Sequence, residues 1–210
     1  MAEELIFYTN PQSRGRIVRW MLEEVGVPYE TKVLEYGTTM KSPEYLSINP
    51  MGKVPAIVHG GRVVTECAAI CAYLADVLPE AGLLPQTLDE KANYYRWLFF
   101  AAGPLESVLN NRAVFKEEPE VEKQRMLGYG NFRDTLNALS VAVKANPYIA
   151  GDRFTAADVY VGSHIGWGLQ FGTMESREEF IRYFDRLRER PAFTRAMSLD
   201  DVQAKEISEG

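Results

Sequence analysis

The residues best suited to bind a small anionic molecule lie in the run of residues 49–69, NPMGKVPAIVHGGRVVTECAA. Lys53 supplies a cation beside Val54-Pro55, and these two residues can present an exposed strand edge. Glu66 begins a helical pattern, and the N–H groups of a helix N-terminus attract an anion because they have no partners inside the helix. Each feature alone is common in structural loops. Their order within one run is what indicates a binding site.

The two cysteines indicate neither a disulfide framework nor a metal site. Cys67 and Cys71 lie four residues apart, on one face of the expected helix, where a bridge would have awkward geometry. Their spacing with His59 and His164 fits no metal-ligand pattern, so no metal is expected. Cys67 is either a redox-sensitive thiol at the helix start or an inert buried one. So few cysteines are typical of a reducing compartment.

The composition is that of an ordinary globular protein without a basic surface. The 210 residues are 46% hydrophobic and 25% charged, enough for one large domain or two small ones. The net charge of −6 argues against nucleic acid or an anionic membrane as partner. The start, MAEELIFYTN, lacks the positive charge of a signal peptide, and no run approaches the ~18 apolar residues of a membrane span. We therefore expect a cytoplasmic protein.

The spacing of apolar residues predicts the elements that hold the binding run. The first eighty residues are expected to alternate strand, helix and strand, and then to form a short helix, a hairpin and a last helix. Gly60-Gly61 predicts a tight turn between the two hairpin strands, because both turn positions need a positive φ. Ser42-Pro43 predicts the start of the short helix. The basic cluster Arg14, Arg16 and Arg19 is expected on a solvated helix face or in a subunit contact.

Beyond residue 79 the strand signal nearly disappears. Residues 80–88 contain Gly82 and Pro85 and predict a linker. Residues 89–210 keep helical spacing, and Thr155–Asp158 and Ser176–Glu179 are capping-box patterns that predict two helix starts. The expected fold is thus an α/β domain at residues 1–79 followed by an all-helical domain at residues 89–210.

Two motifs resemble the glutathione transferase family, of a bacterial-type or serine-type subclass. The first runs from Asn49 through the Gly-Gly hairpin to Thr65-Glu66-Cys67, and the second is NPYIAGD at residues 146–152 followed by FTAAD at residues 154–158. Their order and spacing cover essentially the whole chain. The resemblance implies a thioredoxin-like, glutathione-binding first domain, a helical second domain that forms the second-substrate pocket, and a homodimer.

The resemblance also assigns roles within the first motif. Glutathione is a tripeptide with a carboxylate at each end and a thiol between them. Val54, before a cis bond to Pro55, would pair with its cysteinyl backbone, and Lys53 would bind its glycine carboxylate. Glu66 and Cys67 would hold the γ-glutamyl end. The family usually has Ser or Thr where this chain has Cys67, and a thiol is a poor substitute for the hydroxyl donor.

The group that activates the glutathione thiol is expected near the end of the first strand. Tyr8, Thr9, Asn10 and Ser13 are the candidates, and the absence of a cysteine there argues against subclasses that form a mixed disulfide. We favour Ser13, with Tyr8 as the alternative and a backbone amide or Arg14 as further possibilities.

The second-substrate pocket is expected at the start of the helical domain. An aromatic-rich wall suits an apolar electrophile, and helix core is the structural alternative for each lining residue. The candidates for this wall are Phe100, Leu105, Leu109, Arg112 and Trp167. The expected activity is transfer of glutathione to a hydrophobic electrophile, with no metal. Glutathione-dependent peroxidase or reductase activity, and a non-catalytic adaptor with the same fold, are the competing hypotheses.

Overall fold

The computed structural model describes residues 3–116 and 118–209, which form two compact units. The first unit combines the residues up to Leu83 with those from Glu189 onwards, and the second runs from Leu84 to Arg188. Each is described separately below. Within the described residues, no helix has the length and apolar character needed to cross a membrane.

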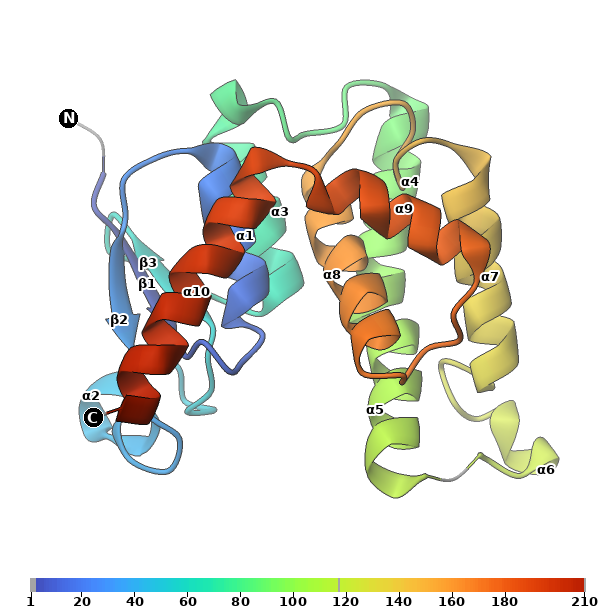
Figure 1. Ribbon diagram of the computed structural model, residues 1–210, viewed down its shortest axis with the longest axis horizontal. Helices are drawn as coiled ribbons and strands as arrows, with labels where there is room; N and C mark the ends of the chain where they lie inside the picture. The colour runs from blue at the N-terminus through green and yellow to red at the C-terminus, as the bar shows by residue number, and fades with distance from the viewer. Residues whose placement is uncertain (1–2, 117, 210) are drawn as a thin grey trace. The chain divides into compact units, whose positions relative to one another are not determined.

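The first unit is built on a four-stranded mixed sheet with the order β2-β1-β3-β4 (Figure 1). Its strands are β1 (Leu5–Thr9), β2 (Glu30–Val33), β3 (Ala56–His59) and β4 (Arg62–Thr65). Strand β1 pairs in parallel with β2 and antiparallel with β3, so that Tyr8 lies between Lys32 and Ala56. Gly60 and Gly61 have φ values of 54° and 79°, which confirms the predicted tight turn.

Helices cover both faces of this sheet. They are α1 (Gly15–Val25), the 3₁₀ turn η1 (Thr39–Lys41), α2 (Pro43–Leu46), α3 (Cys67–Val77), the 3₁₀ turn η2 (Pro79–Ala81) and α10 (Pro191–Glu209). Successive side chains of β1 point to opposite faces. Tyr8 therefore lies in a small cluster with Met40, Tyr45 and Ala56, on the face that α2 covers. The predicted start of α2 is confirmed, because the Ser42 side chain accepts a hydrogen bond from the Tyr45 N–H.

The second unit is helical throughout its regular elements. They are α4 (Leu88–Phe100), the π-helical turn η3 (Ala101–Leu105), α5 (Glu106–Phe115), α6 (Val121–Gln124), α7 (Phe132–Ala145), α8 (Ala156–Gln170) and α9 (Glu178–Arg188). The buried carboxylate of Asp158 anchors this unit. It accepts hydrogen bonds from the Ile149 N–H at 2.7 Å, the Thr155 N–H at 2.8 Å and the Tyr183 hydroxyl at 2.7 Å. Thr155 and Asp158 form the predicted capping box.

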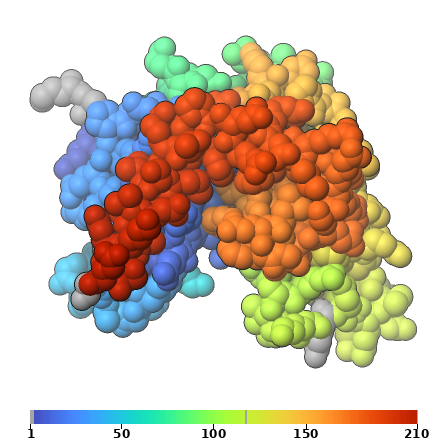
Figure 2. Space-filling view, viewed as in Figure 1, coloured from blue at the N-terminus to red at the C-terminus, as the bar shows by residue number. Residues whose placement is uncertain are grey.

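One helix departs from the expected division of the chain. Residues 89–210 were expected to form one helical domain, but α10 packs along α1 and belongs to the first unit (Figures 1 and 2). Phe193 lies edge-on against Trp20 at 5.0 Å between ring centroids, and Arg190 donates to both carboxylate oxygens of Glu24. These contacts join residues far apart in sequence, which a local pattern does not reveal.

Candidate functional site

The loop between β1 and α1 is held in shape by its own side chains. The Asn10 amide donates to the Leu34 carbonyl at 2.8 Å and accepts from the Gln12 N–H at 2.9 Å. The Ser13 hydroxyl donates to the Asn10 carbonyl at 2.6 Å and accepts from the Gly15 N–H at 2.9 Å. The Ser13 proton therefore points at the backbone. This proton can reach a ligand's sulfur only if the Ser13 hydroxyl rotates, while its oxygen continues to accept the hydrogen bond from the Gly15 N–H.

The start of α1 lies unusually close to the end of β1. A Cβ atom on Gly15 would lie 2.0 Å from the Thr9 hydroxyl oxygen, so only glycine fits there. The Thr9 hydroxyl is buried and has no hydrogen-bond partner in the part of the chain that the structure describes. Thr9 and Asn10 thus shape the loop from the inside, whereas Ser13 is half-buried at its rim.

Tyr8 lies on the other face of the sheet from the helix pair α1 and α3. Its ring packs against the Tyr45 ring at 5.5 Å between centroids, and the Lys32 ammonium lies 5.8 Å above it. Val54 packs against the same cluster. The Tyr8 hydroxyl makes no hydrogen bond to any of residues 3–116 and 118–209, so it is available as a donor.

The backbone before β3 is fixed at Lys53 and open at Val54. The Lys53 carbonyl accepts hydrogen bonds from the Tyr45 hydroxyl at 2.6 Å and from the Asn49 amide at 2.8 Å. Burial raises the pKa of Tyr45 to about 12, so this hydroxyl stays a donor at ordinary pH. The Val54-Pro55 bond is cis, as expected. Among the described residues nothing bonds to the N–H or C=O of Val54, which leaves both groups for a ligand.

The start of α3 offers backbone N–H groups to an anion. Glu66 precedes the helix with φ 67° and ψ 120°, and its exposed side chain does not cap the first turn. Such a backbone conformation is costly for a residue with a side chain, by about 1–3 kcal/mol, and is enriched at functional sites. The Cys67 thiol is buried and contacts the Arg14 carbonyl at 3.7 Å, which joins this helix start to the loop that carries Ser13.

The second cysteine is a core residue. Cys71 is fully buried on α3, and burial raises the pKa of its thiol well above the ordinary value. Neither cysteine forms a disulfide. In the described parts of the chain, no group of three or more His, Cys, Asp or Glu side chains is arranged to hold a metal ion.

The residues expected to line the second pocket have different environments within the helical unit. Phe100, at the end of α4, is half-buried and lies edge-on against Trp97 at 5.1 Å, and Trp167 on α8 is half-buried. The Arg112 guanidinium is exposed and lies 3.9 Å from the centre of the Phe132 ring. Leu105 and Leu109 are buried, which favours the structural alternative, helix core, at those two positions.

Two residues that position the backbone of the site were not predicted from the sequence. Tyr45 and Asn49 together hold the carbonyl of Lys53, the residue before the open backbone. Asn49 lies inside the run that predicted the site, but its role depends on the bond to the carbonyl of Lys53, four residues further along the chain. Tyr45 gave no signal beyond its place in the short helix α2.

The fold and the site geometry together define a thioredoxin-like domain with an open backbone edge and an anion-attracting helix start, joined to a helical domain. A family model described as "Glutathione S-transferase, N-terminal domain" matches residues 13–77. Glutathione S-transferase GstA of Escherichia coli O157:H7 is 30% identical over 183 residues, with 85% of this chain and 87% of that protein covered. The chain therefore belongs to the glutathione S-transferase family.

Further relatives agree with this assignment. Glutathione S-transferase GST-4.5 of Xanthomonas campestris pv. campestris is 28% identical, with 97% of this chain and 98% of that protein covered. A glutathione transferase family member from Pseudomonas fluorescens, solved with two glutathione molecules bound, has a TM-score of 0.72 at 26% identity, with 93% and 92% covered. Elongation factor 1-gamma 3 of Oryza sativa is 27% identical, and the match spans 88% of this chain and 46% of that protein.

Proposed function

We propose that the protein is a glutathione transferase that joins glutathione to a hydrophobic, electrophilic small molecule. The open backbone of Val54 carries this proposal. Its N–H and C=O would pair with the cysteinyl backbone of glutathione, while Lys53 would bind the glycine carboxylate. The start of α3, at Glu66 and Cys67, would bind the γ-glutamyl carboxylate through backbone N–H groups. The solved relative with bound glutathione supports this choice of ligand.

The chemical step needs a donor beside the glutathione sulfur. The thiol gives its proton to water, and the hydroxyl donor stabilises the thiolate that remains. The sulfur then forms a bond to the electrophilic carbon, and a leaving group departs with the electrons of the bond that breaks. Ser13 is the proposed donor and Tyr8 the alternative. Lowering a thiol pKa from ~8.5 by ~2 units raises the thiolate at pH 7 from about 3% to about three-quarters. Intrinsic nucleophilicity falls about 8-fold, so the net gain is only about three-fold.

Most of the acceleration must therefore come from placing the electrophile against the sulfur. Phe100, Leu109, Arg112 and Trp167 on the helical unit are the proposed wall for that molecule, and of these Leu109 is the buried one. We propose a cytoplasmic location, where glutathione is present in its reduced form.

The proposed homodimer is supported by an apolar stripe on α4. Leu88, Tyr95 and Phe99 are exposed by 84%, 55% and 73%, and their spacing places them on one face of the helix. A second copy of the chain would cover this stripe. Light scattering coupled to gel filtration measures the mass in solution, and a monomer would contradict the dimer.

Binding to immobilised glutathione, followed by calorimetry with free glutathione, tests the proposal. Lys53→Gln should weaken binding about five-fold, because one ion pair at an exposed site is lost. Lys123→Gln, which replaces an exposed lysine on α6, is the matched control and should bind as the wild type does. No binding by the wild-type protein would contradict both enzymatic hypotheses.

If glutathione binds, a conjugation assay with an aromatic halide and an assay with a peroxide separate transfer from reduction. The similarity to elongation factor 1-gamma 3 favours one further candidate, a non-catalytic adaptor. Glutathione binding without turnover in either assay would support the adaptor and contradict the transferase.

A further inference from the structure

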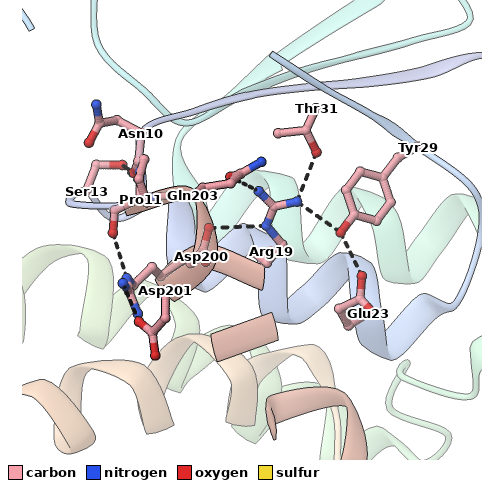
Figure 3. Close-up of polar contacts among 12 residues, drawn as sticks. Asn10, Pro11, Ser13, Arg19, Glu23, Tyr29, Thr31, Asp200, Asp201 and Gln203 are labelled. Carbon is pink, nitrogen blue, oxygen red and sulfur yellow. Dashed lines mark hydrogen bonds and ion pairs between the residues drawn. The ribbon is translucent and has the colours of Figure 1, made fainter. Parts of the chain in front are cut away.

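The last helix of the chain holds the loop that precedes α1. The Arg16 guanidinium donates through Nε to the Pro11 carbonyl at 2.6 Å, and its Nη2 lies 2.8 Å from a carboxylate oxygen of Asp201 on α10. Figure 3 labels Pro11 and Asp201, the two partners of this side chain. One side chain thus bridges the loop and the C-terminal helix. The sequence predicts Arg16 on a solvated helix face or in a subunit contact, but its side chain is only 22% exposed because the loop and α10 of the same unit enclose it.

A buried arginine fixes α10 in the position that this bridge requires. The Arg19 side chain is 3% exposed, and it is buried by its own chain, which corrects the expectation of a solvated helix face or a subunit contact. It bonds to Asp200 at 3.2 Å and to Gln203 at 2.6 Å on α10 (Figure 3). It also donates to Thr31 on β2 at 2.9 Å. Because Asp201 follows Asp200 directly, the buried contact sets where the Asp201 carboxylate meets Arg16.

The bridged carbonyl is part of the backbone that orients Ser13. Pro11 follows Asn10, whose carbonyl accepts both the N–H and the hydroxyl of Ser13, at 3.0 and 2.6 Å. A shift of the Pro11 carbonyl would therefore move the Asn10 carbonyl that holds the Ser13 backbone N–H, and with it the Ser13 side chain. Misplacement of reacting groups by about 1 Å can cost on the order of 100-fold in rate.

We propose that Arg16 and Asp201 are positioning residues for the thiol-activating loop, and that α10 is thereby a working part of the glutathione site. The proposal rests on the proposed function for its catalytic consequence. Its structural content, that Asp201 holds the loop in place through Arg16 and the Pro11 carbonyl, does not depend on glutathione.

The chain offers a matched control for this bridge. Arg195 on α10 bonds to Glu23 on α1 at 3.1 Å, so it is a second ion pair between the same two helices, near the opposite end of α1. Its side chain is 55% exposed and that of Asp201 is 61% exposed. Arg195→Gln removes this ion pair and also the 3.2 Å hydrogen bond from Arg195 to the Glu23 carbonyl, so it disturbs the contact between the two helices at least as much as Asp201→Asn does. Only Asp201→Asn acts beside the loop.

Amide hydrogen exchange of residues 12–16 tests the structural content without any ligand. Exchange should become about two- to five-fold faster in Asp201→Asn, the range expected for one partly exposed ion pair, and should stay unchanged in Arg195→Gln. Equal exchange in the two variants would overturn the proposal. Arg16→Met also removes the hydrogen bond to Pro11 and should speed exchange about ten-fold.

Kinetics and ultraviolet titration of the bound thiol test the catalytic consequence. Asp201→Asn should lower kcat about two- to five-fold and raise the pKa of the bound glutathione thiol, with KM for the electrophile unchanged. Asp201→Glu should restore both values. If the wild-type protein fails to bind glutathione, the proposed function is overturned. If glutathione binds but its thiol pKa is the same in Asp201→Asn as in the wild type, only the positioning role is overturned.

Discussion

The Tyr45 hydroxyl donates a 2.6 Å hydrogen bond to the Lys53 carbonyl, and this bond ties α2 to the backbone that leads into Val54. Because Lys53 and Val54 are adjacent, the bond helps fix the orientation of the peptide that is proposed to meet glutathione. The Asn49 amide supports the same carbonyl. Two side chains thus hold the peptide group that precedes the open edge at Val54.

Tyr45→Phe should weaken glutathione binding about three- to ten-fold, because a typical neutral hydrogen bond is worth about 0.5–1.5 kcal/mol. The loss should be constant between pH 6 and pH 9, since burial raises the pKa of Tyr45 to about 12 and the hydroxyl stays protonated throughout. Calorimetric titration measures the change. Tyr148→Phe removes the hydroxyl of a half-buried tyrosine in the helical unit and serves as the control. Unchanged affinity in Tyr45→Phe would show that the bond does not position the edge.

Replacement of the two candidate donors should identify the residue that activates the thiol. Ser13→Ala should lower kcat and also reduce the free energy of unfolding by about 1 kcal/mol, because the Gly15 N–H loses its acceptor. Ser13→Thr keeps a hydroxyl and should recover part of both losses. Tyr8→Phe should leave kcat unchanged if Ser13 is the donor. A normal kcat in both Ser13→Ala and Tyr8→Phe would refute both assignments.

Asp200→Ala should lower the free energy of unfolding by about 3–5 kcal/mol, because it leaves the Arg19 charge buried without its carboxylate. Urea denaturation measures this change. Asp185→Ala removes an exposed ion pair with Arg188, in which the side chains are 43% and 59% exposed, and should cost less than about 1 kcal/mol. Equal effects of the two substitutions would contradict the assigned importance of the buried pair.

Glu179 should make stability sensitive to acid. A hydrogen bond from Ser140 and the nearby Lys144 ammonium lower the pKa of Glu179 to about 2, below its ordinary 4.5. A carboxyl whose pKa is lower in the folded state stabilises the fold above pH 4.5, and this contribution is lost as the pH falls toward 2. Glu179→Gln should therefore be destabilised by on the order of 2–3 kcal/mol at pH 6 and by much less near pH 2. Urea denaturation at both pH values measures the difference, and a constant difference would contradict the prediction.

Local sequence determined the elements that build the two units. Gly60-Gly61 specified its turn because few residues other than glycine accept two successive positive φ values, and both are observed. Ser42-Pro43 and Thr155–Asp158 specified helix starts because a cap is a contact between residues only three apart. The Ser176–Glu179 pattern was less informative. Helix α9 begins at Glu178, and the Glu179 side chain turns to Ser140 and Lys144 on α7.

Tertiary structure decided what the local patterns left open. Arg16 and Arg19 predicted a solvated helix face or a subunit contact. In the folded unit α10 packs against both, so Arg16 bridges the Pro11 carbonyl and Asp201, and Arg19 is buried against Asp200. The Arg19–Asp200 bond joins residues 181 positions apart, and no spacing rule connects them. A sequence shows which residues can make a turn, a cap or a strand because those contacts are local. Which distant side chain pairs with a buried charge, or donates a hydrogen bond to a carbonyl, depends on how the whole unit packs.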